Sequence, residues 1–216
     1  MKIGFIGAGH IGANAAKLFA EAGHEIAISN SRGPETLEDV AAELGEGVRA
    51  VTAEEAAEFG DVVFVSIPFG KYRDLPAEAL NGKIVIDSNN YYPERDGRYP
   101  ELDEGKTTSS ELLAGRLKGA RVVKAFNTIW FEHLKSQGDT ALPPEDRRAI
   151  FIAGDDERAK ETVAKLIDDI GFAAVDTGTL REGGRRQQPG AAVYNKILKP
   201  EEAETILVES VGEGKI

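Results

Sequence analysis

A glycine-rich turn near the N-terminus constrains the fold more than any other feature of the sequence. An apolar run, residues 2–6, leads into this turn, and an amphipathic segment, residues 13–22, follows it. The turn consists of Gly7, Ala8, Gly9, His10, Ile11 and Gly12. Glycines at this G-x-G-x-x-G spacing allow a tight bend, close approach of the backbone to a pyrophosphate, and close packing of helix on strand. The sequence therefore predicts a dinucleotide-binding βαβ unit with the pyrophosphate at the helix N-terminus.

Further apolar runs of strand length alternate with helical patterns. The expected strands are residues 2–6, 25–29, 48–51, 62–67, 84–87, 122–126, 149–154 and 173–178, and the expected helices are residues 13–22, 34–44, 53–59 and 155–171. Strands joined by helices of this length form a mostly parallel sheet. We therefore expect an α/β fold of the Rossmann type, a doubly wound sheet with a small C-terminal extension. Residues 1–178 would form the NADP-binding domain, and residues 179–216 would line the cofactor or substrate cleft or form a dimer contact.

Three segments rich in Gly, Pro, Asn and Asp interrupt this alternation. They are residues 88–106, 137–146 and 182–190, and their composition predicts loops. The last of them continues a basic cluster, Arg181, Arg185 and Arg186, which we expect in a solvated surface loop. Beyond it, the tail from residue 199 to residue 216 predicts one short helix over residues 201–210.

Composition excludes several classes of function. The formal net charge of −11 disfavours a nucleic-acid or anionic-membrane partner, because both bind basic surfaces. The chain has no cysteine and only three histidines, so disulfides, thiolate nucleophiles and a protein metal centre are not expected. No apolar run is long enough for a membrane helix and no secretory signal pattern precedes residue 2, so we expect a cytoplasmic protein.

The end of the second expected strand indicates which dinucleotide is bound. Proteins that bind NAD usually carry Asp or Glu there, on the ribose diol. This strand instead leads into Asn30, Ser31 and Arg32, whose side chains can hold a 2′-phosphate. Arg32 is one of three basic residues among residues 1–48, so its position is informative. The pattern predicts NADP(H) as the cofactor.

The nicotinamide should lie beyond the carboxyl ends of the strands, where ligands bind in such sheets. Candidate cofactor contacts follow the fourth, fifth and sixth strands: Ile67, Pro68, Phe69, Asn89, Ala125 and Asn127. Asn127 and Lys124 are the candidates for positioning the reactants. Some of these candidates have a structural alternative: Asn127 could cap a helix, and Phe69 could fill the core. Hydride exchange between two cofactors needs no strong acid, whereas a carbonyl or imine substrate would need Lys124, Tyr91 or Tyr92 as proton donor.

Five segments together resemble the coenzyme F-420-dependent NADP oxidoreductase family. They are residues 2–12, 28–37, 65–70, 122–129 and 176–190. The resemblance implies hydride exchange between NADP(H) and a deazaflavin or flavin, and frequent dimers. It assigns Gly7, Gly9, His10, Ile11 and Gly12 to the pyrophosphate, Ser31 and Arg32 to the 2′-phosphate, and Pro68, Ala125 and Asn127 to the nicotinamide. The segment around residues 124–127 is also similar to the reductase domains of six-transmembrane metalloreductases.

Three functions fit these features. The first is an NADP(H)-dependent oxidoreductase that passes a hydride to coenzyme F-420, FMN or FAD as a small-molecule co-substrate, in a homodimer. The second is an imine or carbonyl reductase that encloses its substrate as a dimer. The third is a non-catalytic NADP(H) redox sensor. Residues 182–195 differ from those of the deazaflavin enzymes, so the acceptor stays open at this point.

Overall fold

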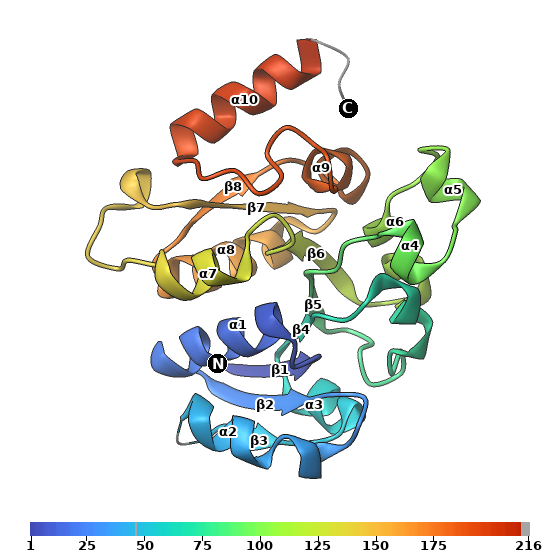
Figure 1. The fold of residues 1–216 in the computed structure, drawn as a ribbon, viewed down its shortest axis with the longest axis vertical. Helices are drawn as coiled ribbons and strands as arrows, with labels where there is room; N and C mark the ends of the chain where they lie inside the picture. The colour runs from blue at the N-terminus through green and yellow to red at the C-terminus, as the bar shows by residue number, and fades with distance from the viewer. Residues whose placement is uncertain (46, 213–216) are drawn as a thin grey trace.

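The predicted strands lie side by side in one sheet. The computed structural model describes residues 1–45 and 47–212, and among these residues the sheet has eight strands in the order β3-β2-β1-β4-β5-β6-β7-β8. They are β1 (Lys2–Ile6), β2 (Glu25–Ser29), β3 (Arg49–Ala50), β4 (Val62–Val65), β5 (Ile84–Asp87), β6 (Arg121–Ala125), β7 (Ala149–Gly154) and β8 (Ala173–Asp176). Neighbouring strands are parallel except β6 and β7. This confirms the Rossmann-type prediction (Figure 1).

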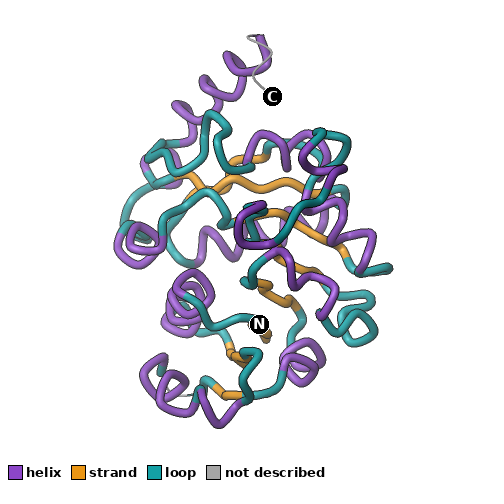
Figure 2. The backbone as a smooth tube through the Cα atoms, turned by 45° about the vertical axis from the view of Figure 1, so that its right-hand side comes forward, coloured by secondary structure: helices purple, strands orange, loops and turns teal. Residues whose placement is uncertain are grey.

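Helices cover both faces of the sheet, as Figures 1 and 2 show. One face packs against α1 (His10–Glu21), α2 (Glu38–Leu44), α7 (Phe131–Ser136) and α8 (Glu157–Asp169). The other face packs against α3 (Ala53–Phe59), the 3-10 helix η2 (Phe69–Asp74), α6 (Ser109–Arg116) and α9 (Leu180–Gln187). The remaining elements are η1 (Pro34–Thr36), α4 (Pro93–Asp96), α5 (Pro100–Asp103), η3 (Pro144–Asp146) and α10 (Pro200–Gly212).

Burial on both faces explains the continuous apolar strands. In β1, Ile3 and Phe5 point into the α1 side, where Phe5 stacks on Phe64 of β4 with ring centroids 5.0 Å apart. Between them, Gly4 leaves room for α3, because a Cβ atom there would lie 1.9 Å from the carbonyl oxygen of Ala56. A strand with helices on both sides can carry no polar face.

The loop prediction for residues 182–190 is wrong over most of its length. Arg181, Arg185 and Arg186 lie in α9, whose N-cap Thr179 accepts a hydrogen bond from the backbone N–H of Glu182. The two glycines of α9 serve close packing, since a Cβ atom on Gly183 would lie 2.4 Å from Oγ1 of Thr177. Glycines that allow a buried helix face to pack closely therefore gave this segment a composition typical of a loop.

Smaller differences concern the ends of elements. Short helices α4 and α5 occupy part of the expected loop over residues 88–106, and the expected helix over residues 34–44 is divided into η1 and α2 at Leu37. The predicted C-terminal helix is confirmed as α10, whose Ala203 and Leu207 pack against Phe151 and Val175 of the last two strands. Residues 213–216 of the predicted tail lie outside the described residues. The division at residue 178 stays a prediction.

Candidate functional site

The glycine turn joins β1 to α1 with little space around it. Gly7 has a φ of +111°, and a Cβ atom there would lie 2.0 Å from the carbonyl oxygen of Ser66. A Cβ atom on Gly12 would lie 2.1 Å from the carbonyl oxygen of Gly7. Gly9 differs from both, because no atom beyond its own local backbone and chain neighbours lies within 4 Å of the position its Cβ would take. Gly7 and Gly12 are thus required by the fold itself, whereas Gly9 faces open space.

The N-terminus of α1 has the properties of an anion site. Within the described residues no side chain caps it, and its first turn has no acidic residue. Helices α3, α8 and α9 differ, since each has a capping Thr or Asp and Glu in its first turn. The first N–H groups of a helix lack partners within the helix, and its dipole favours an anion there. Near this end, His10 stacks on Phe131 of α7 with ring centroids 4.3 Å apart.

The loop after β2 presents Ser31 and Arg32 to solvent. The side-chain oxygen of Asn30 accepts hydrogen bonds from the backbone N–H groups of Arg32 and Gly33, at 2.8 Å and 3.1 Å. The side-chain nitrogen of Asn30 donates to Oγ1 of Thr36, at 2.9 Å. Asn30 therefore shapes the loop. In the described part of the chain, neither the Arg32 guanidinium nor the Ser31 hydroxyl has a hydrogen-bond or ion-pair partner.

Three asparagines meet beyond the carboxyl ends of β4, β5 and β6. The backbone N–H of Ile67 donates to Oδ1 of buried Asn89, at 2.8 Å. Asn127 donates from Nδ2 to the carbonyl oxygen of Gln187, at 2.7 Å, and to Oδ1 of Asn90, at 3.1 Å. These bonds fix which end of each amide is nitrogen. They leave Nδ2 of Asn89 and Oδ1 of Asn127 buried and without a partner among the described residues.

The backbone leading to Asn127 is strained. Phe126 has a φ of +64°, and its ring is fully buried against Phe64 and Phe19. A bulky residue in the left-handed region costs about 1–3 kcal/mol and persists only where the surroundings enforce it. Such outliers concentrate at functional sites.

A buried ion pair lies below the same edge of the sheet. Lys124 of β6 donates from Nζ to Oδ2 of Asp87, at 3.2 Å, and to the carbonyl oxygen of Asn89. Both side chains are about 2 % exposed or less. Burial lowers the pKa of the Lys124 ammonium, and Asp87 opposes part of this effect. The hydroxyl of Ser110 also donates to Oδ2 of Asp87, at 2.7 Å.

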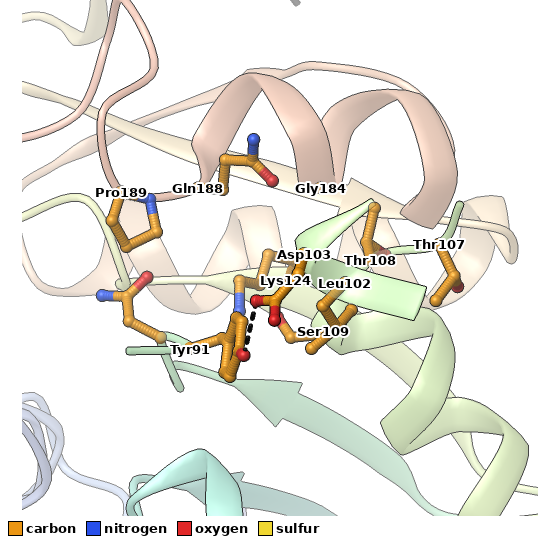
Figure 3. A pocket seen from close by; sticks show the side chains of 11 residues that line it. Tyr91, Leu102, Asp103, Thr107, Thr108, Ser109, Lys124, Gly184, Gln188 and Pro189 are labelled. Carbon is orange, nitrogen blue, oxygen red and sulfur yellow. Dashed lines mark hydrogen bonds between the residues drawn. The ribbon is translucent and has the colours of Figure 1, made fainter. Parts of the chain in front are cut away.

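Lys124 reaches a cavity of about 180 Å³ between the loop after β5, α5, the start of α6 and the end of α9 (Figure 3). Eleven residues line it: Asn90, Tyr91, Leu102, Asp103, Thr107, Thr108, Ser109, Lys124, Gly184, Gln188 and Pro189. Figure 3 also shows the hydrogen bond from the Tyr91 hydroxyl to Asp103, at 2.8 Å.

A pair of tyrosines ties the C-terminal extension to this region. The hydroxyls of Tyr92 and Tyr194 lie 2.5 Å apart, and Nδ2 of Asn90 donates to Tyr194 at 3.3 Å. Burial raises the pKa of Tyr194, and the hydrogen bond with Tyr92 raises it further. Sequence reasoning missed Tyr194, because no local pattern links it to a residue 102 positions away.

The other predicted contacts lie in different environments. Ile67 is half-buried and Pro68 is exposed at the strand edge, whereas Ala125 is buried in the core. Phe69 is fully buried and stacks on Tyr72, with ring centroids 4.8 Å apart, so its ring fills the core. In the turn, Ala8 and Ile11 are half-buried and pack on the core.

The basic cluster of α9 bonds mainly to backbone oxygens. Arg185 donates to the carbonyl of Gly105, and Arg186 donates to that of Thr177 at 3.1 Å. Arg181 lies 3.7 Å from Glu111. Among the described residues no group of three His, Cys, Asp or Glu side chains could hold a metal ion. No helix within those residues is long and apolar enough to cross a membrane.

Comparisons with known proteins agree with this geometry. The family model described as NADP oxidoreductase coenzyme F420-dependent matches residues 2–91. A hypothetical protein from Sinorhizobium meliloti has a similar structure, with a TM-score of 0.80 and 34% identity over 92% of this chain and 95% of the other. A proposed F420-dependent NADP reductase from Arthrobacter sp. FB24 gives a TM-score of 0.69 and 26% identity, over 83% of this chain and 86% of that one.

Curated proteins include a similar segment within a longer chain. Metalloreductase STEAP3 of Rattus norvegicus is 29% identical over 181 residues, which are 83% of this chain and 34% of that protein. The chain thus spans about a third of the length of the curated relatives it matches. The family model, the structural relatives and the uncapped glycine turn confirm what the sequence motifs indicate. The chain belongs to the coenzyme F420-dependent NADP oxidoreductase family and is an NADP-dependent oxidoreductase.

Proposed function

We propose that the chain transfers a hydride between NADP(H) and a flavin-type acceptor, a deazaflavin such as coenzyme F420 or a flavin. The observation that carries this proposal is the pair of unpartnered amide atoms at the sheet edge, Nδ2 of Asn89 and Oδ1 of Asn127. Buried polar atoms of this kind cost free energy unless a ligand or water satisfies them. A nicotinamide carboxamide offers one acceptor and one donor group, which complement these two atoms.

The rest of the dinucleotide fits the same edge. The open space at Gly9 and the uncapped start of α1 would receive the pyrophosphate, together with the backbone of Ala8, His10 and Ile11. Arg32 and Ser31 would bind the 2′-phosphate, with Asn30 holding their loop in shape. A charge-assisted, bidentate contact from Arg32 would favour NADP(H) over NAD(H).

NADPH would supply the hydride from its nicotinamide ring. Asn89 and Asn127 would orient that ring through its carboxamide, and the hydrogen bonds from Asn127 to Gln187 and Asn90 hold its side chain in place. Ile67 and Pro68 border the same space at the end of β4. Alignment of two rings removes most of the entropic part of the barrier, so positioning by this chain would provide much of the acceleration.

One observation favours a second candidate, reduction of an imine or carbonyl. Such a reaction needs a proton donor, and the paired hydroxyls of Tyr92 and Tyr194 lie at the edge where the nicotinamide is proposed. In this case Tyr92 or Tyr194 would protonate the substrate. The acceptor assay below separates the two candidates.

The assay follows absorbance of NADPH with coenzyme F420, FMN, FAD, and a set of cyclic imines and ketones. We expect oxidation of NADPH with at least one flavin-type acceptor and much slower oxidation of NADH. Turnover with imines or ketones alone would favour the second candidate. Binding of NADPH without turnover by any acceptor would contradict both and favour a redox sensor.

Assembly and location belong to the proposal as well. We propose a homodimer, for which the exposed apolar side chains Ile197 and Val208 of the C-terminal extension offer contact surface. Light scattering of the purified chain measures its mass, and a monomer at micromolar concentration would contradict this part. We also propose a cytoplasmic location.

A further inference from the structure

The Lys124 cavity has a size and composition that limit what it can hold. Its volume of about 180 Å³ is below the roughly 300–1,000 Å³ of sites that enclose a whole drug-sized ligand. It therefore suits one edge of a ring system and not the entire molecule. The lining residues come from β6, from the loop after β5, and from α5, α6 and α9 with their flanking residues, and Figure 3 shows their side chains turned toward one another.

Lys124 supplies a directed donor at this cavity. A lysine ammonium has three N–H groups. Two are taken by Asp87 and by the carbonyl of Asn89, and among the described residues the third has no partner. Since Asp87 balances the charge of Lys124, the lysine offers a hydrogen bond without making the cavity strongly positive.

The surrounding charges argue for a neutral polar ligand. Asp103 of the lining is ionised, because hydrogen bonds from Tyr91 and Arg98 lower its pKa. Its nearest cation, Arg98, lies 3.0 Å away and balances its charge. A carboxylate or phosphate would gain little from a cavity whose charges are already paired. A conjugated carbonyl, which accepts hydrogen bonds without carrying a full charge, fits it better.

We propose that the cavity holds the carbonyl edge of the planar hydride acceptor, with Lys124 as the hydrogen-bond donor to that edge. This inference rests on the proposed function and names the contact that the acceptor makes. The cavity adjoins the proposed nicotinamide site, because Asn90 lines it and also bonds to Asn127.

The role of Lys124 follows from the electron balance. The hydride brings two electrons and one hydrogen from the reduced nicotinamide, so negative charge develops on the conjugated carbonyl edge. Lys124 stabilises this charge and donates the proton that completes the reduction, then regains a proton from solvent at the cavity mouth. Its lowered pKa favours the donation. The titratable groups facing it are Asp87, Asp103 and Tyr91.

The test removes the pair without leaving a buried charge. In the double variant Lys124→Met with Asp87→Asn, no unpaired charge remains. Its control is Lys160→Met with Asp176→Asn, a second Lys–Asp pair, 2.7 Å apart, which does not line the cavity. Lys160 is also buried, and its other partner, Glu157, is exposed, so this variant leaves no buried charge either. A further variant, Gln188→Trp, fills the cavity from its exposed rim, so the inference can be tested even if the double variant does not fold.

Two readouts are measured on each variant. The first is binding of oxidised FMN and 5-deazariboflavin to the NADP⁺-loaded protein, followed by fluorescence; the second is steady-state reduction by NADPH. The Lys124/Asp87 variant should bind the acceptor about tenfold more weakly and lower kcat as well. Its Kd for NADPH should rise by less than its Kd for the acceptor, because the bond from Ile67 still holds the Asn89 side chain. Gln188→Trp should raise KM for the acceptor, and the Lys160/Asp176 control should change neither readout.

The outcomes separate the two proposals. If the wild-type protein turns over a flavin-type acceptor and the Lys124/Asp87 and Gln188→Trp variants keep its full activity, the cavity inference is overturned and the proposed function stands. Absence of turnover in the wild-type protein with every flavin-type acceptor would overturn the proposed function, and the inference would fall with it. Equal losses in the Lys124/Asp87 variant and in the Lys160/Asp176 control would also overturn the inference, because a general effect on folding would explain them.

Discussion

The three glycines of the turn allow a test that separates folding from cofactor binding. Replacement of each by alanine adds the same single methyl group within six residues of chain. The structure nevertheless predicts opposite results for Gly9 and Gly12. A methyl group on Gly12 would lie 2.1 Å from a backbone oxygen, whereas a methyl group on Gly9 would meet nothing within 4 Å beyond its own local backbone and chain neighbours.

The expected magnitudes follow from these surroundings. Gly12→Ala must push α1 away from β1, an overpacking that costs about 1–3 kcal/mol, or roughly 2–12 °C in Tm for a chain of this size. Gly9 has a φ of −74°, which alanine adopts without strain. Gly9→Ala should therefore leave the free protein unchanged or stabilise it by about 0.4–1 kcal/mol, because alanine restricts the unfolded chain.

Binding should reverse this order of effects. A methyl group on Gly9 occupies the space proposed for the pyrophosphate, so we expect Kd for NADPH to rise by about tenfold or more, equivalent to about 1.4 kcal/mol. Urea unfolding measures the first quantity and titration of NADPH fluorescence measures the second. The matched control is Gly115→Ala in α6, where the added methyl group also meets open space but lies away from the turn.

Two results would refute this reasoning. One is Gly9→Ala protein that binds NADPH as tightly as the wild type, because the pyrophosphate would then lie elsewhere. The other is Gly12→Ala protein of undiminished stability, because the packing of α1 on β1 would then not depend on that glycine. Gly115→Ala should bind NADPH normally.

Three further predictions concern single side chains. Arg32→Ala should raise Kd for NADPH about 10- to 100-fold and that for NADH by less than about twofold; equal effects on the two would contradict the assignment of the 2′-phosphate. Burial lowers the pKa of His24, with the N-terminal ammonium adding to the effect and Asp169 opposing it. The contribution of neutral His24 to stability is therefore complete above the unfolded pKa of about 6.5 and is lost as the pH falls through the lower folded pKa. The free energy of unfolding of His24→Gln, measured in urea, should accordingly depend less on pH between about pH 7 and 5 than that of the wild type. Tyr194→Phe removes the bond with Tyr92 and should lower the free energy of unfolding by about 1 kcal/mol; an unchanged urea midpoint would show that this contact contributes nothing.

Local patterns predicted the parts of the fold that local physics determines. The glycine turn, the apolar strands and the amphipathic α8 each have a periodicity or spacing that follows from backbone geometry. Helix α9 was missed because Gly183 and Gly184 look like loop residues until Thr177 and Thr108 are seen packed against them. Composition does not distinguish these two uses of glycine.

The candidate site was only partly accessible from sequence, since its contacts join distant segments. The order of strands placed Asn89 and Asn127 at one edge, but not the bonds that leave one amide atom of each without a partner. The pairing of Lys124 with Asp87 depends on the register of β5 and β6, which puts the two residues side by side. Of the two alternatives for Phe69, the structure shows the ring buried by Tyr72, Tyr91 and Tyr99, a packing that has no local signal, and its role as a cofactor contact stays a prediction.

The most direct test of the central claim follows the transferred hydrogen itself. NADPH carrying deuterium at both hydrogen positions of the reactive nicotinamide carbon is mixed with the protein and an oxidised 5-deazaflavin, and the reduced acceptor is analysed by mass spectrometry. A deazaflavin accepts the hydrogen at carbon, where it does not exchange with water. Direct hydride transfer predicts one deuterium in each reduced acceptor molecule. Reduced acceptor without deuterium, or no reduction of any flavin-type acceptor, would contradict the account.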